Sequence, residues 1–291
     1  MLATACYNQY SPNIPRFYSK FNIVPMPEMA ENQMNAVFTA VLSQNMRKFP
    51  ENIRSLAGAL ATAITEVHSL AKNMCSQSEL LPQLFTNKDA WKVLNSISLI
   101  TDVKESEEMI KLCYHECKRE FEDKISDPKA KGKFSQAMRE VMKKVKGKVT
   151  LNEDIVFVDY MSQQEGRRYQ ENPSREKLVE VTQQHRRELQ LEGRLSNACN
   201  TLHYDACEQV AKMARVLRQS SGNILLVGSK GQGKKSLAKI ASHIMDFRPC
   251  ETKIAEKNLE HWRSFALSSV LENQKTALIM EVEGQADKGM A

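Results

Sequence analysis

One segment of the chain carries glycine, lysine and serine residues at a spacing suited to phosphate chemistry. It reads Ile224-Leu225-Leu226-Val227-Gly228-Ser229-Lys230-Gly231-Gln232-Gly233-Lys234-Lys235-Ser236. Glycines at positions 228, 231 and 233 allow the backbone to curl so that several N–H groups face one point. The helix expected after Gly233 adds the positive end of its dipole. From Gly228 to Lys234 the pattern is G-x-x-x-x-G-K, which predicts a phosphate-binding P-loop with the Lys234 ammonium at the β- and γ-phosphates.

The residue after the P-loop lysine departs from the motif. Lys235 stands where a serine or threonine usually holds Mg²⁺, and a hydroxyl follows only at Ser236. The flanks fit a P-loop, because residues 224–227 are apolar and predict a buried strand. Apolar residues then recur at helical spacing: Leu237, Ile240, Ala241 and Ile244. Two interpretations stay open, a nucleotide site with Ser236 on Mg²⁺, or a strand–turn–helix that keeps the fold without the ligand.

The predicted nucleotide ligands are the residues of the loop itself. They are Gly228, Ser229, Lys230, Gly231, Gln232, Gly233, Lys234, Lys235 and Ser236. Hydrolysis also needs a carboxylate at the end of a neighbouring strand, to hold Mg²⁺ and activate water. The apolar run 277–280 ends in Glu281, which is the candidate for that role.

Length and composition limit the kinds of protein to which this sequence can belong. The 291 residues suffice for two modest domains or one large one, and 42% hydrophobic with 26% charged residues is typical of a globular chain. No apolar run approaches the length of a membrane span, and the N-terminus lacks the features of a signal peptide. Seven cysteines at irregular spacing favour a reducing compartment. We therefore expect no membrane partner.

Two patterns in the sequence could suggest a ligand site, a basic surface and a metal cluster, but each is interpreted as part of an ordinary helix or loop. The net charge of +6 includes basic runs at 129–133 and 143–148, which lack interleaved aromatic residues. They are interpreted as a solvated helix face and loop, with no nucleic-acid partner. Cys113, His115 and Cys117 resemble metal ligands, but positions 113 and 117 share a helix face from which 115 points away. A packed helix is the preferred interpretation, because no second ligand pair follows at zinc-site spacing.

The order of the predicted elements divides the chain. Apolar periodicity predicts helices over 34–47, 50–74, 88–100, 103–125 and 133–146. A short strand at 155–158, a helix over 173–190 capped by Asn172, and a helix over 203–219 precede the P-loop. A helix at 255–271 and the apolar run 277–280 follow it. A helical block followed by a new α/β unit is the pattern expected where one P-loop module ends and the next begins.

The residues resemble the dynein heavy chains, in the tandem AAA+ modules of the motor ring. The resemblance rests on PRFYSKFNIV at 15–24, YHECKREFEDKI at 114–125, VDYM at 158–161 with YQE at 169–171, and the P-loop segment 222–237. In that family the position after the P-loop lysine is commonly not a hydroxyl residue and serine follows, as Lys235 and Ser236 do here. The match covers most of residues 12–245 and looks closer to the axonemal branch.

The resemblance implies a fold and a division of the chain. The expected fold class is a partial α/β P-loop NTPase of the AAA+ type, with a largely helical lid block followed by the start of a second α/β core. Residues 1–48 are assigned to the end of the third AAA+ core, 49–150 to its helical lid, and 151–291 to the first part of the fourth module.

The resemblance also implies a function for the whole motor. It predicts ATP or ADP with Mg²⁺ as cofactors, and ATP-linked minus-end-directed movement along microtubules in a ciliary axoneme. The implied partners are other dynein subunits and the remaining AAA+ modules, with microtubules contacted only indirectly. The implied locations are the cytoplasm, the cytoskeleton and the cilium axoneme. Hydrolysis by this chain alone is not expected, since the later strands, sensor residues and lid of the fourth module are not in the sequence. The alternative function is a helical scaffold whose P-loop does not bind nucleotide.

Overall fold

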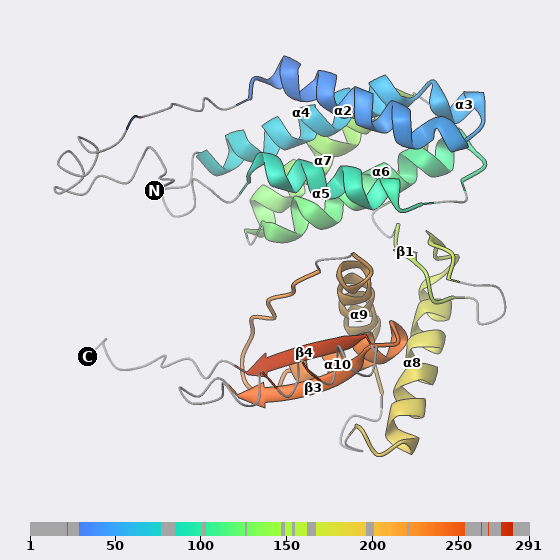
Figure 1. Ribbon diagram of the computed structural model, residues 1–291, viewed down its shortest axis with the longest axis vertical. Coiled ribbons are helices and arrows are strands. Elements are labelled where there is room, and N and C mark those ends of the chain that lie inside the picture. The colour runs from blue at the N-terminus through green and yellow to red at the C-terminus, as the bar shows by residue number, and fades with distance from the viewer. Residues whose placement is uncertain are drawn as a thin grey trace.

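The computed structural model describes most of the chain. The described residues are 22, 29–76, 85–100, 103–125, 127–146, 149–152, 155–161, 167–195, 201–219, 222–253, 263, 267 and 275–281. They form a helical block and a second lobe, which lie one above the other in Figure 1. Within this part of the chain, every helix is too short or too polar to cross a bilayer.

The helical block is built from amphipathic helices around one apolar core. Its elements are α2 (Glu31–Asn45), η1 (Met46–Lys48), α3 (Glu51–Arg54), α4 (Ala57–Ser76), α5 (Asn87–Ser98), α6 (Ser106–Glu120), η2 (Glu122–Lys124) and α7 (Pro128–Val145). On α4, Leu60, Ile64 and Val67 follow one stripe at helical spacing and are fully buried. They pack in one cluster with aromatic side chains from other parts of the block: Phe38, Phe85, Tyr114, Phe121 and Phe134.

The helices lie at the predicted positions, although several begin or end a few residues away: α2 begins at Glu31 and not at residue 34, and α6 covers Ser106–Glu120 and not 103–125. The helix expected over 50–74 is divided into α3 and α4 by a turn at residues 55–56. The last helix of the block begins at Pro128 and not at residue 133, because the Asp127 carboxylate accepts the N–H groups of Lys129 and Ala130. The basic run 129–133 therefore belongs to the first turns of α7.

The first helix packs within the helical block. α2 lies against α4, and its residues Met34, Phe38 and Leu42 are buried in the same core as Leu60. Asn35 adds a hydrogen bond from its amide to the Thr62 hydroxyl at 3.2 Å. The assignment of residues 1–48 to a preceding α/β core stays a prediction, and residues 1–21 lie outside the described part of the chain.

The second lobe places three helices beside a short parallel sheet. β1 (Phe157–Val158) pairs antiparallel with β2 (Gln170–Glu171), and α8 (Arg175–Leu191) and α9 (Tyr204–Leu217) follow. α10 (Lys234–Ile244) then leads to β3 (Arg248–Lys253), which pairs in parallel with β4 (Thr276–Glu281). Leu178, Val210 and Ile240 bring α8, α9 and α10 into one apolar core.

The predicted cap of α8 was wrong by two residues. Ser174 is the N-cap, and its hydroxyl accepts the Lys177 N–H at 3.2 Å. Asn172, the predicted cap, instead donates its side-chain amide to the Ser174 carbonyl at 2.7 Å. Both side chains suit a cap, and Ser174 lies directly before the first residue with helical geometry.

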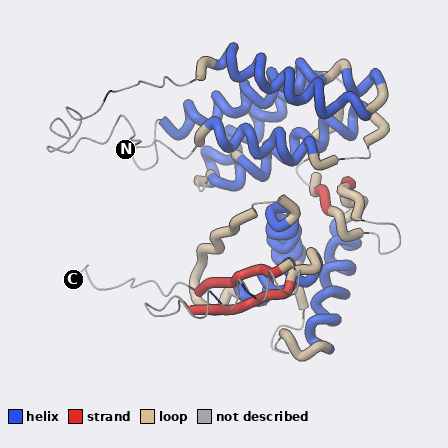
Figure 2. The backbone as a smooth tube through the Cα atoms, in the orientation of Figure 1, coloured by secondary structure: helices blue, strands red, loops and turns tan. Residues whose placement is uncertain are grey.

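The strand predicted over 224–227 is not formed among the described residues. The segment from residue 222 to 229 runs as a loop between α9 and α10 (Figure 2), and Leu225 and Val227 are 83% and 86% exposed. An apolar run becomes a strand only where a neighbour pairs with its N–H and C=O groups. In the described part of this lobe, β3 and β4 pair with each other and not with this segment.

The strand β3 was missed in the sequence. Its residues Arg248, Pro249, Cys250, Glu251, Thr252 and Lys253 are mostly polar and lack alternation. β3 forms because β4 pairs with it in parallel along the whole length of β3. The run 277–280 lies within β4, as its apolar character suggests. The helix predicted at 255–271 falls almost entirely outside the described residues.

Candidate nucleotide site

The P-loop region turns sharply into α10 through two glycines in the left-handed region. Gly231 has φ +82° and Gly233 has φ +74°, and Gly233 is the N-cap of α10. A side chain at either position would be strained, because L-residues other than glycine seldom adopt this backbone. The turn exposes residues 228–233 to solvent directly in front of the free N–H groups of the helix. This geometry suits an anion.

Lys234 lies at the first position of α10 and reaches back to the loop. Its ammonium donates to the Gly228 carbonyl at 2.6 Å and to the Ser229 carbonyl at 2.7 Å. The ammonium of Lys234 thus lies against the backbone of the loop. Phosphate oxygens would add acceptors to an ammonium that already has two backbone partners.

Gly228 has little space for a side chain. A Cβ built there would lie 2.7 Å from Oε1 of Gln232, the flexible end of that side chain. Gln232 therefore lies across the first turn of the loop. The structure brings these predicted ligands together on one short turn.

The two residues after Lys234 differ in environment. Lys235 is exposed and lies 3.9 Å from the Glu251 carboxylate of β3, and Lys239 forms an ion pair with the same carboxylate. Ser236 is half-buried on the following position of α10. The ion pairs hold the first half of α10 beside the last half of β3, so the P-loop lies towards the carboxyl end of that strand.

The candidate carboxylate lies at the end of the adjacent strand. Glu281 is the last residue of β4 and is in register with Lys253, the last residue of β3. Because parallel strands end at one edge of a sheet, the backbone of Glu281 lies at the edge to which α10 presents its N-terminus. The side chain of Glu281 is outside the described part, so its role stays a prediction.

The P-loop helix is held by apolar packing. Ile240, Ala241 and Ile244 are buried against α8 and α9, as their spacing predicts. Leu226 and Leu237 are partly buried at the edge of the same core. Leu226 therefore anchors the loop segment although it belongs to no sheet.

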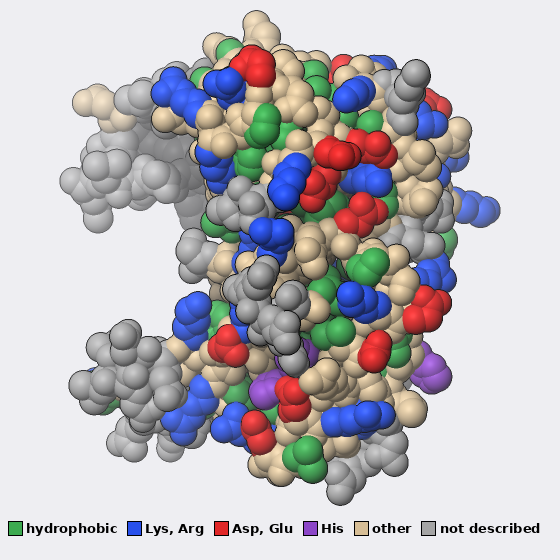
Figure 3. Space-filling model, turned by 90° about the vertical axis from the view of Figure 1, so that its right-hand side faces the viewer, with side chains coloured by type: hydrophobic (Ala, Val, Ile, Leu, Met, Phe, Trp, Pro, Cys, Tyr) green, Lys and Arg blue, Asp and Glu red, His purple; other side chains and the backbone are tan. Residues whose placement is uncertain are grey.

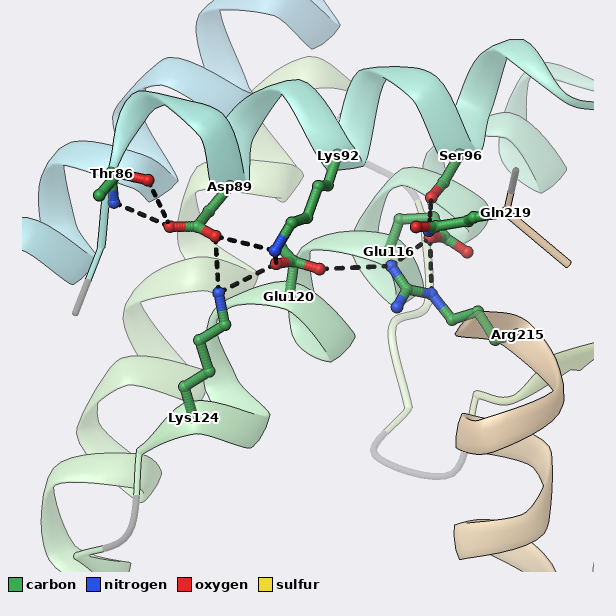
Figure 4. A network of polar contacts seen from close by, with 9 residues as sticks. All are labelled: Thr86, Asp89, Lys92, Ser96, Glu116, Glu120, Lys124, Arg215 and Gln219. Atoms are coloured by element: carbon green, nitrogen blue, oxygen red, sulfur yellow. Dashed lines mark hydrogen bonds and ion pairs between the residues drawn. The ribbon is translucent and has the colours of Figure 1, made fainter. Parts of the chain in front are cut away.

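A buried charge network joins the lobe that carries the P-loop to the helical block (Figure 4). Arg215 of α9 donates from Nε to Oε2 of Glu116 on α6 at 2.8 Å, and Nη2 lies 2.7 Å from the same oxygen. Tyr169 donates its hydroxyl to the other Glu116 oxygen at 2.7 Å. Gln219 bonds Ser96 at 2.9 Å across the same junction. Helix α9, which leads into the P-loop segment, is thereby fixed to the helical block.

The network continues along the helical block through a second set of charges. Lys124 lies 2.8 Å from Asp89 and 2.9 Å from Glu120, and Lys92 bridges the same two carboxylates. Asp89 also accepts the backbone N–H of Thr86 at 2.8 Å. Burial alone would raise the pKa of Asp89, but these donors outweigh it and hold that pKa well below its usual range.

Two adjacent residues of α6 have shifted pKa values at this junction. Burial lowers the pKa of His115 to about 3, and its Nδ1–H donates to the Ile155 carbonyl at 3.1 Å. Burial would raise the pKa of Glu116, but Arg215 and the other donors hold it at about 2. The His115 ring is tilted against that of Phe157, with ring centroids 5.5 Å apart and an interplanar angle of 49°, while Cys113 and Cys117 are buried in the core of the block. The His115 ring thus faces β1 and the two thiols face another side, as expected for a packed helix.

Three features of the region around α10 occur together in one known class of protein. A turn through left-handed glycines, a lysine bound back to the loop, and a helix beside parallel strands are the parts of a P-loop nucleotide-binding unit. Sequence reasoning found these residues from their spacing. It missed the pairing of Glu116 with Arg215, because the two residues are 99 positions apart and no local pattern links them.

Comparison with known proteins narrows this class. Residues 201–281 match the family described as the P-loop containing dynein motor region D4. The human dynein axonemal heavy chain 6 is 26% identical over 256 residues, which cover 84% of this chain and 6% of the relative. The dynein axonemal heavy chain 1 of Rattus norvegicus is 23% identical over 88% of this chain and 6% of the relative. The dynein axonemal heavy chain 2 of Mus musculus is 25% identical over 83% of this chain and 6% of the relative.

Over most of its length, the chain is similar to a segment of the axonemal dynein heavy chains. The resemblance predicted from the sequence is confirmed by these matches. The chain spans about 6% of the length of these curated relatives. The mostly helical structure fits a partial AAA+ unit.

Proposed function

We propose that this chain is a segment of an axonemal dynein heavy chain motor that binds ATP or ADP at residues 228–236. The observation that carries the proposal is the left-handed turn at Gly233 with Lys234 directed at the loop, inside the residues that match the dynein D4 region. Lys234 would contact the β- and γ-phosphates, and the N–H groups of the loop would surround them.

Two further residues are given roles in the nucleotide site because of where they lie. Ser236 is the proposed Mg²⁺ ligand, as the first hydroxyl after the P-loop lysine. Glu281, at the end of β4, is the proposed carboxylate for the water side of the site. Mg²⁺ would supply charge neutralisation between the phosphates, and the residues present offer it a hydroxyl and a strand-end carboxylate.

In the whole motor, we infer a contribution to minus-end-directed movement along microtubules in cilia. The segment would work with the other AAA+ modules and subunits of the motor, at the axoneme. The helical block would act as the lid of the preceding module, and residues 151–291 as the beginning of the next. The charge network around Glu116 and Arg215 supports this arrangement, because it ties the helical block to the helix that precedes the P-loop.

A thermal-shift titration of the purified chain with Mg²⁺-ATP and Mg²⁺-ADP tests nucleotide binding. A ligand that binds only the folded state adds about 2.7 kcal/mol of stability at a concentration 100-fold above its Kd. We expect a rise in Tm that Lys234→Ala abolishes. Lys143→Ala is the matched control, because Lys143 is exposed on α7 and far from the loop in sequence. It should keep the full shift.

One observation favours the alternative, a helical scaffold whose P-loop does not bind nucleotide. Leu225 and Val227 are exposed where a P-loop unit would have a buried strand. A cooperative melt that neither nucleotide moves, in the parent chain and in Lys234→Ala alike, would establish this alternative and overturn nucleotide binding.

A further inference from the structure

Three side chains from two helices converge in the second lobe, away from the P-loop turn. His185 and Glu188 lie one turn apart on α8, and His243 lies near the end of α10. Nδ1 of His185 is 3.1 Å from Oε2 of Glu188, and Nε2 of His243 is 3.3 Å from the same oxygen. The three candidate ligand atoms all lie within 4.8 Å of one another.

These separations are those of ligands around a small cation. Zinc binds imidazole nitrogen and carboxylate oxygen at about 2.0–2.2 Å, so neighbouring ligands of a tetrahedral site lie about 3.3 Å apart. Two edges of the cluster already have that length. Only a modest approach of the two imidazoles would complete the triangle.

The side chains of the cluster are partly buried by their neighbours and are still accessible to solvent. The side chains of His185 and His243 are 17% and 20% exposed, and Glu188 is 39% exposed. Figure 3 shows histidine side chains at the surface of the second lobe beside acidic ones. The two rings lie 5.8 Å apart at 73°, and the Tyr160 ring lies 6.2 Å from His185. Partial burial fixes the rings, while the carboxylate side stays open to a metal and its water.

The helices that carry the ligands are fixed by the core. Leu189, one residue after Glu188, and Ile244, one residue after His243, are buried in the same apolar cluster. Arg167, a basic residue of the same lobe, forms an ion pair with Asp246. The cluster thus offers two imidazole nitrogens and one carboxylate oxygen as ligand atoms.

We propose that His185, Glu188 and His243 bind a divalent transition metal, with Zn²⁺ the best fit and water as the fourth ligand. Two imidazoles and one carboxylate suit Zn²⁺ better than Mg²⁺ or Ca²⁺, which prefer oxygen ligands alone. Without metal, each imidazole donates an N–H to Glu188. Metal binding at these nitrogens needs the other tautomer of each ring: the proton leaves the nitrogen that faces Glu188, the other ring nitrogen carries one instead, and a neutral imidazole releases no net proton.

The consequence is a link between α8 and the P-loop helix. His243 lies at the opposite end of α10 from Lys234, so a bound metal would fasten the C-terminal end of the helix that begins at the phosphate loop. The metal would stabilise the lobe without contacting a nucleotide. The inference therefore stands independently of nucleotide binding.

The test uses the full chain, stripped with a chelator and titrated with Zn²⁺ in the absence of nucleotide. We expect one equivalent to bind and to raise Tm. Co²⁺ as a probe should give the visible absorption of a tetrahedral site without a thiolate charge-transfer band. Glu188→Gln, which keeps the shape of the side chain, and His243→Ala should each weaken Zn²⁺ binding by at least about tenfold.

Two matched variants separate this site from adventitious binding. His203→Ala removes an exposed histidine at the start of α9, and Cys250→Ser removes a partly exposed thiol of β3. Both should bind Zn²⁺ like the parent. The proposal is overturned if Zn²⁺ leaves the Tm of the parent unchanged, or if Glu188→Gln and His243→Ala retain parental affinity. A loss in Cys250→Ser alone would assign the metal to a thiol site and overturn it as well.

Discussion

The guanidinium of Arg215 lies against the carboxylate of Glu116, with both side chains removed from solvent. The Arg215 side chain is 7% exposed and that of Glu116 is fully buried. Glu116 also accepts the Tyr169 hydroxyl, so both of its oxygens have partners. This contact joins α6 of the helical block to α9 of the second lobe.

Removing the cation from this pair should be costly. Arg215→Met leaves the Glu116 charge buried without its main partner, and a broken buried ion pair typically costs about 3–5 kcal/mol. Urea unfolding should show a loss of this size. The double variant Arg215→Met with Glu116→Gln should recover part of it, since no unpaired charge remains. A single-variant loss no larger than that of an exposed control, Lys143→Met, would contradict this prediction.

Acid should destabilise the fold in two stages. The pKa of His115 is lowered to about 3 and that of Glu116 to about 2, both below their unfolded values. The folded state therefore binds fewer protons than the unfolded state, and stability is lost as the pH falls. The loss through His115 begins at about pH 6.5 and that through Glu116 at about pH 4.5, the pKa values of these groups in the unfolded chain.

The two stages can be separated by variants. Unfolding free energies measured across this range should flatten in the upper part for His115→Gln and in the lower part for Glu116→Gln. The isosteric amide at 116 keeps an acceptor for Tyr169. A parent chain whose stability is constant between these pH values would show that neither group carries the predicted shift.

The left-handed glycine at the start of α10 should not tolerate a side chain. Gly233 has φ +74°, so Gly233→Ala should cost about 1–2 kcal/mol and weaken nucleotide binding. Gly132→Ala is the matched control, because Gly132 lies inside α7 and a Cβ there meets no atom within 4 Å. That change should stabilise the chain by about 0.5–1 kcal/mol. Chemical denaturation of both variants checks the opposite signs.

The exposed and buried leucines should respond differently to truncation. Leu225 is 83% exposed, so Leu225→Ser should change the unfolding free energy by less than about 0.5 kcal/mol. Leu60 is fully buried, and Leu60→Ala should cost about 2–5 kcal/mol. A large loss for Leu225→Ser in urea unfolding would mean that the segment is buried as a strand in solution, as the sequence alone suggests.

Local patterns predicted the parts of this protein that depend on near neighbours in the chain. Helical periodicity located α2, α4 to α7, α8, α9 and α10, since each buries one stripe that its own residues define. The spacing of Gly228, Gly233 and Lys234 predicted the phosphate loop, because a turn needs only the few residues that form it. The apolar run at 277–280 predicted β4 for the same reason.

Tertiary structure decided what depends on a partner far away in the sequence. A strand exists only where another strand pairs with it, so the apolar residues 224–227 stay unpaired while the polar residues of β3 form a ladder with β4. The pairing of Glu116 with Arg215 depends on how α6 meets α9, and that of His185 with His243 on how α8 meets α10. Near neighbours in the sequence therefore define the helices and the glycine turn before α10, whereas packing between distant segments sets the sheet, the buried charges and the histidine cluster.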